Sequence, residues 1–157
     1  ILDSGYERVV FVCPPLGESR EGNNYTHEQR LDGFREAMAG RSVEAVIISS
    51  ESYEKEAASI LETNDCNTAF FCSGDIYAMD IMKHLKSCGK QAPRDYGIMG
   101  FDDIELLEYL SPRLSTIYNS VEEVAKRAVE LLFDEMEGRK IAMETYERYR
   151  LVQGETL

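Results

Sequence analysis

Short apolar runs alternate with stretches of helical periodicity along almost the whole sequence. The runs predict β-strands because they are rich in β-branched and aromatic residues and are bounded by Gly, Pro or polar residues. The run at residues 8–12 (RVVFV), for example, lies between Gly5 and the Pro14-Pro15 pair. The predicted strands cover residues 8–12, 43–48, 68–72, 97–101, 115–118 and 146–152.

Between these runs, apolar residues recur every three or four positions, which predicts helices with one buried face. One helix opens with the capping-box pair Thr26 and Gln29, and another opens with the pair Ser120 and Glu123. Gly40 ends the first of these two helices. The predicted helices cover residues 26–39, 52–62, 75–88, 104–109 and 120–137.

Strands that alternate with helices predict βαβ units. The fold class is therefore α/β, with a mostly parallel sheet that carries helices on both faces. In such folds ligands bind outside the carboxyl ends of the strands, and candidate functional residues are sought there.

Composition narrows the class of protein. The chain has 157 residues, which predicts one domain, and its 43% hydrophobic residues are enough to bury a core. The net charge of −12 is poorly suited to direct contact with DNA, which is held mainly through Lys and Arg. The sequence begins at Ile1 with no signal-peptide pattern, and we expect a piece of a longer protein.

Cysteine and histidine usage argues against a disulfide framework or a metal site. The four cysteines contain no CxxC pair, and we expect reduced thiols, with Cys13 and Cys72 buried at strand ends. His27 and His84 are too few and too far apart in the sequence to propose a metal site. No cofactor is expected.

Catalytic motifs are also missing from the sequence. It contains no GxxxxGK[ST] phosphate loop, no GxGxxG fingerprint and no GxSxG elbow. The neighbouring carboxylates Asp102 and Asp103 are able to do acid–base chemistry in principle. Side chains of adjacent residues at a strand end point apart, so the pair is poorly placed to act on one substrate atom.

Polar side chains gather where the predicted strands end. Gly74 and Asp75 follow the third strand, Asp102 follows the fourth and Asn119 follows the fifth, while Arg30 lies in the first turns of a helix. Donors from Arg and acceptors from Asp suit a ligand with many hydroxyl groups. Structural roles remain open, because Asp75 at a helix start is typical of an N-cap and Arg30 on a helix surface is able to pair with a neighbouring carboxylate.

Four segments in order resemble one known family. They are residues 30–38 (RLDGFREAM), 67–79 (NTAFFCSGDIYAM), 89–103 (GKQAPRDYGIMGFDD) and 112–117 (PRLSTI). They are similar to the R-x-x-G-F-x-x-A-[LM], P-T-A-[IV]-x-x-x-N-D-x-x-A, G-x-x-[VI]-P-x-D-[IV]-[SG]-[VI]-x-G-[FY]-D-[DN] and P-x-L-[ST]-T-[IV] patterns of lactose-repressor-type (LacI/GalR) transcriptional regulators. The order of the motifs, more than any one of them, makes the resemblance specific.

The resemblance implies the C-terminal effector-binding region of such a regulator, with a periplasmic-binding-protein-like fold of two lobes. A sugar or related polar effector would lie between the lobes, held by Arg30, Asp102 and Asn119, and Gly74 and Asp75 would also belong to the ligand-binding residues. Gly74 departs from the family, which usually has Asn at that position. The family's aromatic residue before the second helix is also missing, and Tyr53 is the nearest ring.

The same resemblance implies partners and a location. The regulator would be a cytoplasmic homodimer that binds operator DNA through an N-terminal helix-turn-helix domain missing from this chain, and it would not be an enzyme. Dimer contacts would come partly from the helix around Ala78, Met79 and Met82, although these residues also fit an ordinary core stripe.

The resemblance also divides the chain into three parts. Residues 1–119 would form the C-terminal lobe, residues 120–138 a crossover helix that packs on the other lobe, and residues 139–157 a return segment with the last strand. Without the other lobe, the apolar face of the crossover helix around Val124 and Ala128 has no partner. We expect this helix to be displaced, swapped or buried against another molecule, and a helix standing alone in water would contradict that.

Two rival functions remain open. An extracytoplasmic sugar-binding transport receptor has the same fold, and a secretion signal would identify it. An α/β enzyme that uses Asp75, Asp102 and Asp103 as metal or acid–base groups is the second rival, and turnover would identify it.

Overall fold

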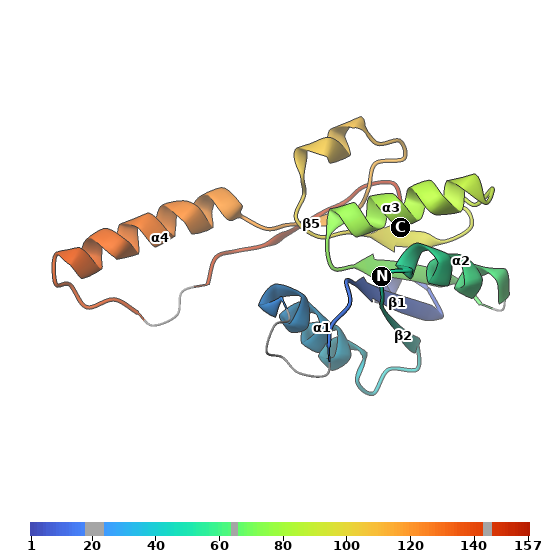
Figure 1. Ribbon diagram of the computed structural model, residues 1–157, viewed down its shortest axis with the longest axis horizontal. Coiled ribbons are helices and arrows are strands. Elements are labelled where there is room, and N and C mark those ends of the chain that lie inside the picture. The colour runs from blue at the N-terminus through green and yellow to red at the C-terminus, as the bar shows by residue number, and fades with distance from the viewer. Residues whose placement is uncertain (18–23, 64–65, 143–145) are drawn as a thin grey trace.

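The computed structural model describes residues 1–17, 24–63, 66–142 and 146–157. Four parallel strands form its main sheet in the order β2-β1-β3-β4 (Figure 1). These strands are β1 (Arg8–Cys13), β2 (Glu44–Ser49), β3 (Thr68–Cys72) and β4 (Gly97–Met99). The predicted α/β class with a mostly parallel sheet is confirmed.

Helices cover both faces of this sheet, as the alternating pattern predicts. The helices of the chain are α1 (Tyr25–Met38), α2 (Tyr53–Thr63), α3 (Asp75–Ser87) and α4 (Val121–Met136), with short 3₁₀ turns η1 (Leu2–Ser4) and η2 (Glu105–Tyr109). All six residues of β1 are buried, because the strand has a neighbour on each side and a helical layer on each face. An apolar run without alternation is typical of such a position.

Alternate side chains of β1 belong to two separate cores. Phe11 packs with Phe34 of α1, and their ring centroids lie 5.2 Å apart in a stacked arrangement. Val10 and Val12 belong to the core on the other face, which α2 and α3 cover. The period of two along a strand explains this division.

A second, two-stranded sheet joins the lobe to α4. It pairs β5 (Thr116–Tyr118) with β6 (Arg150–Val152) in antiparallel fashion. Figure 1 shows that the chain runs out to α4 and back along these two strands. Two strands were predicted too long, since residues 100–101 lie outside β4 and residues 146–149 lie outside β6. Beyond Met99 the chain leaves regular extended geometry, and Asp102 reaches a φ of 116°.

The end of the chain is held against β4. The Ile98 N–H donates to the Thr156 carbonyl over 2.8 Å, and the Thr156 hydroxyl donates to the Ile98 carbonyl over 2.7 Å. Thr156 is fully buried. The C-terminal residues therefore complete the edge of the main sheet although they form no regular strand there.

Neither predicted capping box forms. The N-cap of α1 is Asn24, whose side chain accepts a hydrogen bond of 3.0 Å from the Thr26 N–H. Ser120 is the N-cap residue of α4, but its hydroxyl donates to the Arg148 carbonyl and makes no capping bond. Arg148 lies on the segment that returns from α4 toward the lobe, so its carbonyl is an acceptor outside the helix. The local sequence pattern contains no information about this contact.

Helix α4 stands apart from both sheets (Figure 1). None of its residues is buried, and Val124, Leu132 and Met136 are 47%, 56% and 72% exposed. The helix thus has its apolar face in water, which contradicts the expectation that this face would be covered. Within the described ranges of the chain, every residue of α4 is at least partly exposed.

The cysteines are free in the structure, and Cys13 and Cys72 are buried at the ends of β1 and β3 as predicted. Among the described residues, no helix combines the length and the apolar character needed to cross a membrane.

Candidate functional site

An ion pair between Arg30 and Asp102 lies at the carboxyl edge of the main sheet. The Arg30 Nη2 atom donates to the Asp102 Oδ1 atom over 3.1 Å, and Nη1 donates to the Ser73 carbonyl. The guanidinium carbon also lies 3.8 Å from the centroid of the Phe101 ring. Three different contacts fix the guanidinium plane, since a planar fork of donors binds oxygens and stacks on an aromatic ring at the same time.

The loop after β4 aims the Asp102 carboxylate at Arg30. Asp102 has a φ of 116° and Asp103 a φ of 57°, a region that non-glycine residues rarely occupy. The Asp102 N–H donates to the Ile117 carbonyl over 2.9 Å, which holds this unusual backbone against β5. Such strain is found where the surrounding structure fixes a functional side chain. The Asp103 carboxylate lies 3.9 Å from Arg150, so the two neighbouring carboxylates do not act together.

Gly74 lies directly beside this ion pair. It is the N-cap residue of α3, which contradicts the alternative that Asp75 caps this helix. A Cβ atom at Gly74 would lie 3.6 Å from the Asp102 Oδ2 atom and 3.3 Å from the Tyr77 ring. The missing side chain therefore lets the Tyr77 ring and the Asp102 carboxylate lie close to the Gly74 backbone.

Asp75 lies beneath the site, with only 1% of its surface exposed. Its Oδ1 atom accepts a hydrogen bond of 2.6 Å from the Thr116 hydroxyl, and its Oδ2 atom accepts one of 3.0 Å from the Ile104 N–H. Burial raises the pKa of this carboxyl above its ordinary value, while these hydrogen bonds oppose the rise. Asp75 ties α3 to β5 and to the loop that carries Asp102.

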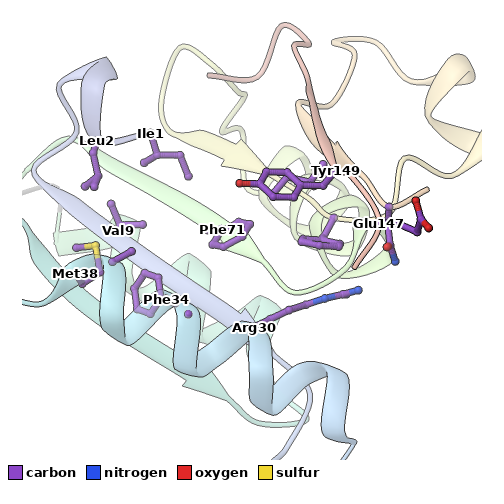
Figure 2. Close-up of a pocket in the computed structure, with 14 residues that line it drawn as sticks. Ile1, Leu2, Val9, Arg30, Phe34, Met38, Phe71, Glu147 and Tyr149 are labelled. Atoms are coloured by element: carbon purple, nitrogen blue, oxygen red, sulfur yellow. The ribbon is translucent and has the colours of Figure 1, made fainter. Parts of the chain in front are cut away.

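Two pockets flank the Arg30–Asp102 pair. The larger, of 680 Å³, contains Arg30 and Asn119, together with a mostly apolar wall from α1 and the main sheet. Figure 2 shows Phe34, Met38 and Phe71 along this wall, while the Arg30 side chain extends away from it. The smaller pocket, of 330 Å³, contains Gly74, Asp75 and Asp102. Arg30 thus shares the larger pocket with Asn119, while its partner Asp102 lines the smaller pocket with Gly74 and Asp75.

Sequence reasoning missed two residues of the smaller pocket, His27 and Tyr77. Each has a helical spacing of three from a predicted site residue, since His27 precedes Arg30 and Tyr77 follows Gly74. That spacing is a weak signal, because it indicates a shared face of a helix and not a pocket. The His27 and Tyr77 ring centroids lie 5.8 Å apart in an edge-to-face arrangement.

The His27 imidazole has an unsatisfied nitrogen at this pocket. Its Nδ1 atom is buried and has no hydrogen-bond partner in the structure. Burial lowers the pKa of His27, the positive charge of Arg30 lowers it further, and the Asp102 carboxylate opposes the shift. The neutral imidazole is therefore the form present at neutral pH.

The titration of His27 provides a test of this environment. Because the folded state disfavours the imidazolium, we expect the pKa of His27 to lie below 6.5, the ordinary value. The unfolded chain then binds more protons in the pH window just below 6.5, so the free energy of unfolding should decrease as the pH falls through it. NMR titration of the imidazole C–H resonances measures the pKa, and a value for His27 at or above 6.5 would contradict the described environment.

Among residues 1–17, 24–63, 66–142 and 146–157, no group of three or more His, Cys, Asp or Glu side chains is placed to hold a metal ion.

Comparisons with known proteins agree with this architecture. The family model described as periplasmic binding protein-like domain matches residues 1–157. A relative from Photobacterium profundum, the HTH-type transcriptional repressor PurR, is 30% identical over 153 residues, which are 93% of this chain and 44% of that protein. The ribose operon repressor of Haemophilus influenzae is 32% identical over 139 residues, 84% of this chain and 40% of its own length.

A solved structure is also similar to this chain. The LacI family transcriptional regulator from Arthrobacter sp. FB24, in complex with lactose, matches with a TM-score of 0.76 and 27% identity. The match covers 99% of this chain and 59% of that one. The chain thus spans about half the length of the curated relatives that it matches. The family resemblance inferred from the sequence is confirmed.

Proposed function

The chain belongs to the family of periplasmic binding protein-like domains, as found in LacI/GalR-type regulators, and from this premise we propose that it is the effector-sensing lobe of such a transcriptional regulator. The effector is a sugar or a related small polar molecule. Its binding energy favours one arrangement of two lobes, and the affinity of the whole protein for operator DNA changes by the linked amount.

The observation that carries this proposal is the Arg30–Asp102 pair between two pockets. Phe101 and Ser73 hold the guanidinium, and the backbone at Asp102 holds the carboxylate. Preorganised charged groups bind hydroxyl groups without first having to be ordered. Arg30 donates to the Oδ1 atom of Asp102, which leaves the Oδ2 atom, facing Gly74, as an acceptor for a ligand.

The similar proteins support a sugar as the class of ligand. One similar regulator was solved in complex with lactose, and another relative is named for the ribose operon. In our proposal Arg30, Asp102 and Asn119 contact the hydroxyl groups, Gly74 lies beside them, and Asp75 supports the loop from beneath. No metal and no cofactor takes part, and the protein does not catalyse a reaction.

The proposed arrangement explains the position of α4. Residues 1–119 form the lobe, residues 120–138 cross to a second lobe, and residues 139–157 return. The exposed apolar face of α4 then packs on that second lobe, since a patch of this kind marks an association surface. The two strands β5 and β6 would be part of the connection between the lobes.

Partners follow from the same class of protein. The regulator acts in the cytoplasm as a homodimer, and it binds operator DNA through a domain outside these residues, because a net charge of −12 suits this chain poorly to contact with phosphates. Ala78 is fully buried in the core, whereas Met79 and Met82 lie at an open pocket and remain available for dimer contacts. A transport receptor of the same fold is the rival function.

Binding of sugars to the intact parent protein tests the proposal. We expect isothermal titration calorimetry with a panel of pentoses, hexoses and disaccharides to find at least one ligand. The Asp102→Asn variant should weaken its binding roughly 10- to 100-fold, since a hydrogen bond to a charged group contributes about 1.5–3 kcal/mol.

The matched control is Arg94→Met, which breaks an exposed ion pair of 2.7 Å with Asp95 far from the site in the fold. This variant should bind the sugar as the wild type does. Equal affinity in the Asp102→Asn protein would contradict the proposed site.

A further inference from the structure

The smaller pocket beside Asp102 has a built aromatic wall that the sequence motifs do not indicate. Tyr77 forms this wall, and its ring lies against the backbone of Gly74. The ring is held on two sides, by His27 at 5.8 Å and by Tyr53 at 5.5 Å between centroids, both edge to face. Edge-to-face pairs are a preferred geometry, so these contacts favour one orientation of the ring.

Tyr53 is itself fixed. Its hydroxyl donates a hydrogen bond of 2.8 Å to the Asp80 carboxylate on α3. Tyr53 is the ring that the sequence places nearest to the missing aromatic residue, but the structure uses it to support Tyr77. The aromatic side chain that faces the pocket is therefore Tyr77, one helix further along the chain.

Gly74 lines the pocket in front of this wall. A side chain at position 74 would enter the volume between the Tyr77 ring and the Asp102 Oδ2 atom, at 3.3 Å and 3.6 Å respectively. Gly74 has a φ of −168°, an extended conformation that any residue adopts. Backbone geometry thus does not require glycine here, whereas the close approach of the Tyr77 ring favours it, since a Cβ atom would meet that ring at 3.3 Å.

His27 supplies the second polar group of this pocket, beside Asp102. Its Nδ1 atom is buried without a partner, and an unsatisfied buried nitrogen is costly unless a ligand or water completes its hydrogen bond. A neutral imidazole nitrogen either accepts or donates, and a hydroxyl group satisfies both cases because it does both. An apolar ring face beside two hydrogen-bonding groups fits one side of a sugar ring.

We propose that His27, Gly74 and Tyr77 form the specificity subsite of the effector cleft. The C–H face of one sugar ring packs on Tyr77, and a hydroxyl group of that ring bridges His27 and Asp102. This inference rests on the proposed function, since it assumes that Arg30 and Asp102 hold a sugar. It assigns the choice among sugars to residues outside the Arg30–Asp102 pair.

NMR spectroscopy of the intact protein tests the subsite, because this chain contains only two histidines. The probe is the tightest-binding member of a panel of pentoses, hexoses and disaccharides. We expect the imidazole resonances of His27 to shift on saturation, whereas those of His84, near the C-terminal end of α3, should not. In an intact protein with further histidines, the His27→Phe and His84→Phe variants assign the two signals.

Affinity measurements on variants provide the second test. The Tyr77→Leu variant should weaken binding roughly 3- to 10-fold, the value of a lost aromatic contact. His27→Phe should weaken it about 10-fold by removing the hydrogen bond. Gly74→Asn should change which sugar binds best, because its side chain occupies the pocket. The matched controls are His84→Phe and Tyr109→Leu, which replace a distant histidine and a tyrosine that is 87% exposed.

The outcomes separate the subsite from the proposed function. If a sugar binds in an Asp102-dependent manner but the His27 signal and both variant affinities are unchanged, the subsite is wrong and the proposed function stands. If no sugar of the panel binds, both are wrong. If binding depends on His27 and Tyr77 as well as on Asp102, both are supported.

Discussion

Replacing Gly154 by alanine is expected to destabilise the fold by about 3 kcal/mol, the upper range for forced overpacking. A Cβ atom at this position would lie 2.3 Å from the Arg113 carbonyl oxygen and 2.5 Å from the Leu114 carbonyl carbon. These are backbone atoms, so no side-chain rotation relieves the contact. The C-terminal residues would have to move away from the edge of β4.

That movement would break several hydrogen bonds at once. The Glu155 N–H donates to the Arg113 carbonyl over 2.7 Å, and the Gly154 N–H donates to the Ser115 hydroxyl over 3.1 Å. Urea unfolding followed by circular dichroism measures the loss. The control is Gly33→Ala on α1, where a Cβ meets nothing within 4 Å and alanine should stabilise the helix by about 0.5–1 kcal/mol. Equal stability of both variants would contradict the described packing.

The Asp75→Ala substitution is expected to have an effect of similar size, also about 3 kcal/mol. It leaves the buried Thr116 hydroxyl and the Ile104 N–H without their acceptor. Loss of the desolvated carboxylate offsets part of this cost, because burial of a charge is itself unfavourable. The control is Glu130→Ala, which breaks an exposed pair of 3.1 Å with Arg127 and should leave the free energy of unfolding unchanged in the same urea experiment.

The pH dependence of stability gives Asp75 a separate signature. Burial raises the pKa of this carboxyl above 3.8, so the folded chain retains a proton that the unfolded chain releases. The free energy of unfolding should therefore decrease as the pH rises from 3.8 through the raised pKa. Asp75→Ala should lack this contribution. An identical slope in both proteins over that window would show that Asp75 is not perturbed.

Much of the fold is predictable from the sequence because its central elements are fully buried. The run at residues 8–12 lies in a strand with neighbours on both sides, and its apolar pattern is typical of that position. Two strands were predicted too long because their limits depend on distant partners, such as the bond between the Gly100 N–H and the Ser115 carbonyl. Local pattern contains no information about such contacts.

The capping boxes failed for the same reason. Asn24 outcompetes Thr26 as the cap of α1, and Ser120 bonds to the returning segment. The apolar stripe of α4 correctly predicted a helix, but the sequence did not predict that the helix stands in water in this chain. An amphipathic pattern indicates which face of a helix is apolar, but it contains no information about what covers that face.

The residues of the candidate site were likewise only partly predictable from the sequence. The Arg30–Asp102 pair follows from the rule that ligands bind at the carboxyl ends of parallel strands. Asp75 satisfies the same rule, yet its oxygens are used by Thr116 and Ile104. His27 and Tyr77 were missed because isolated aromatic residues on helices usually belong to the core, and only the three-dimensional arrangement places them beside Gly74.

The central claim is that a ligand at Arg30 and Asp102 controls DNA binding by the intact protein. In the most direct test, the intact protein is first used to select a DNA sequence that it binds. The dissociation constant of the protein–DNA complex is then measured with and without a saturating concentration of a sugar from the panel. Linkage requires that sugar changes the DNA affinity by the same factor by which DNA changes the sugar affinity. We expect a change of roughly 5- to 150-fold, typical of such coupling, that is lost in Asp102→Asn. A DNA affinity that is unchanged by saturating sugar would contradict the account.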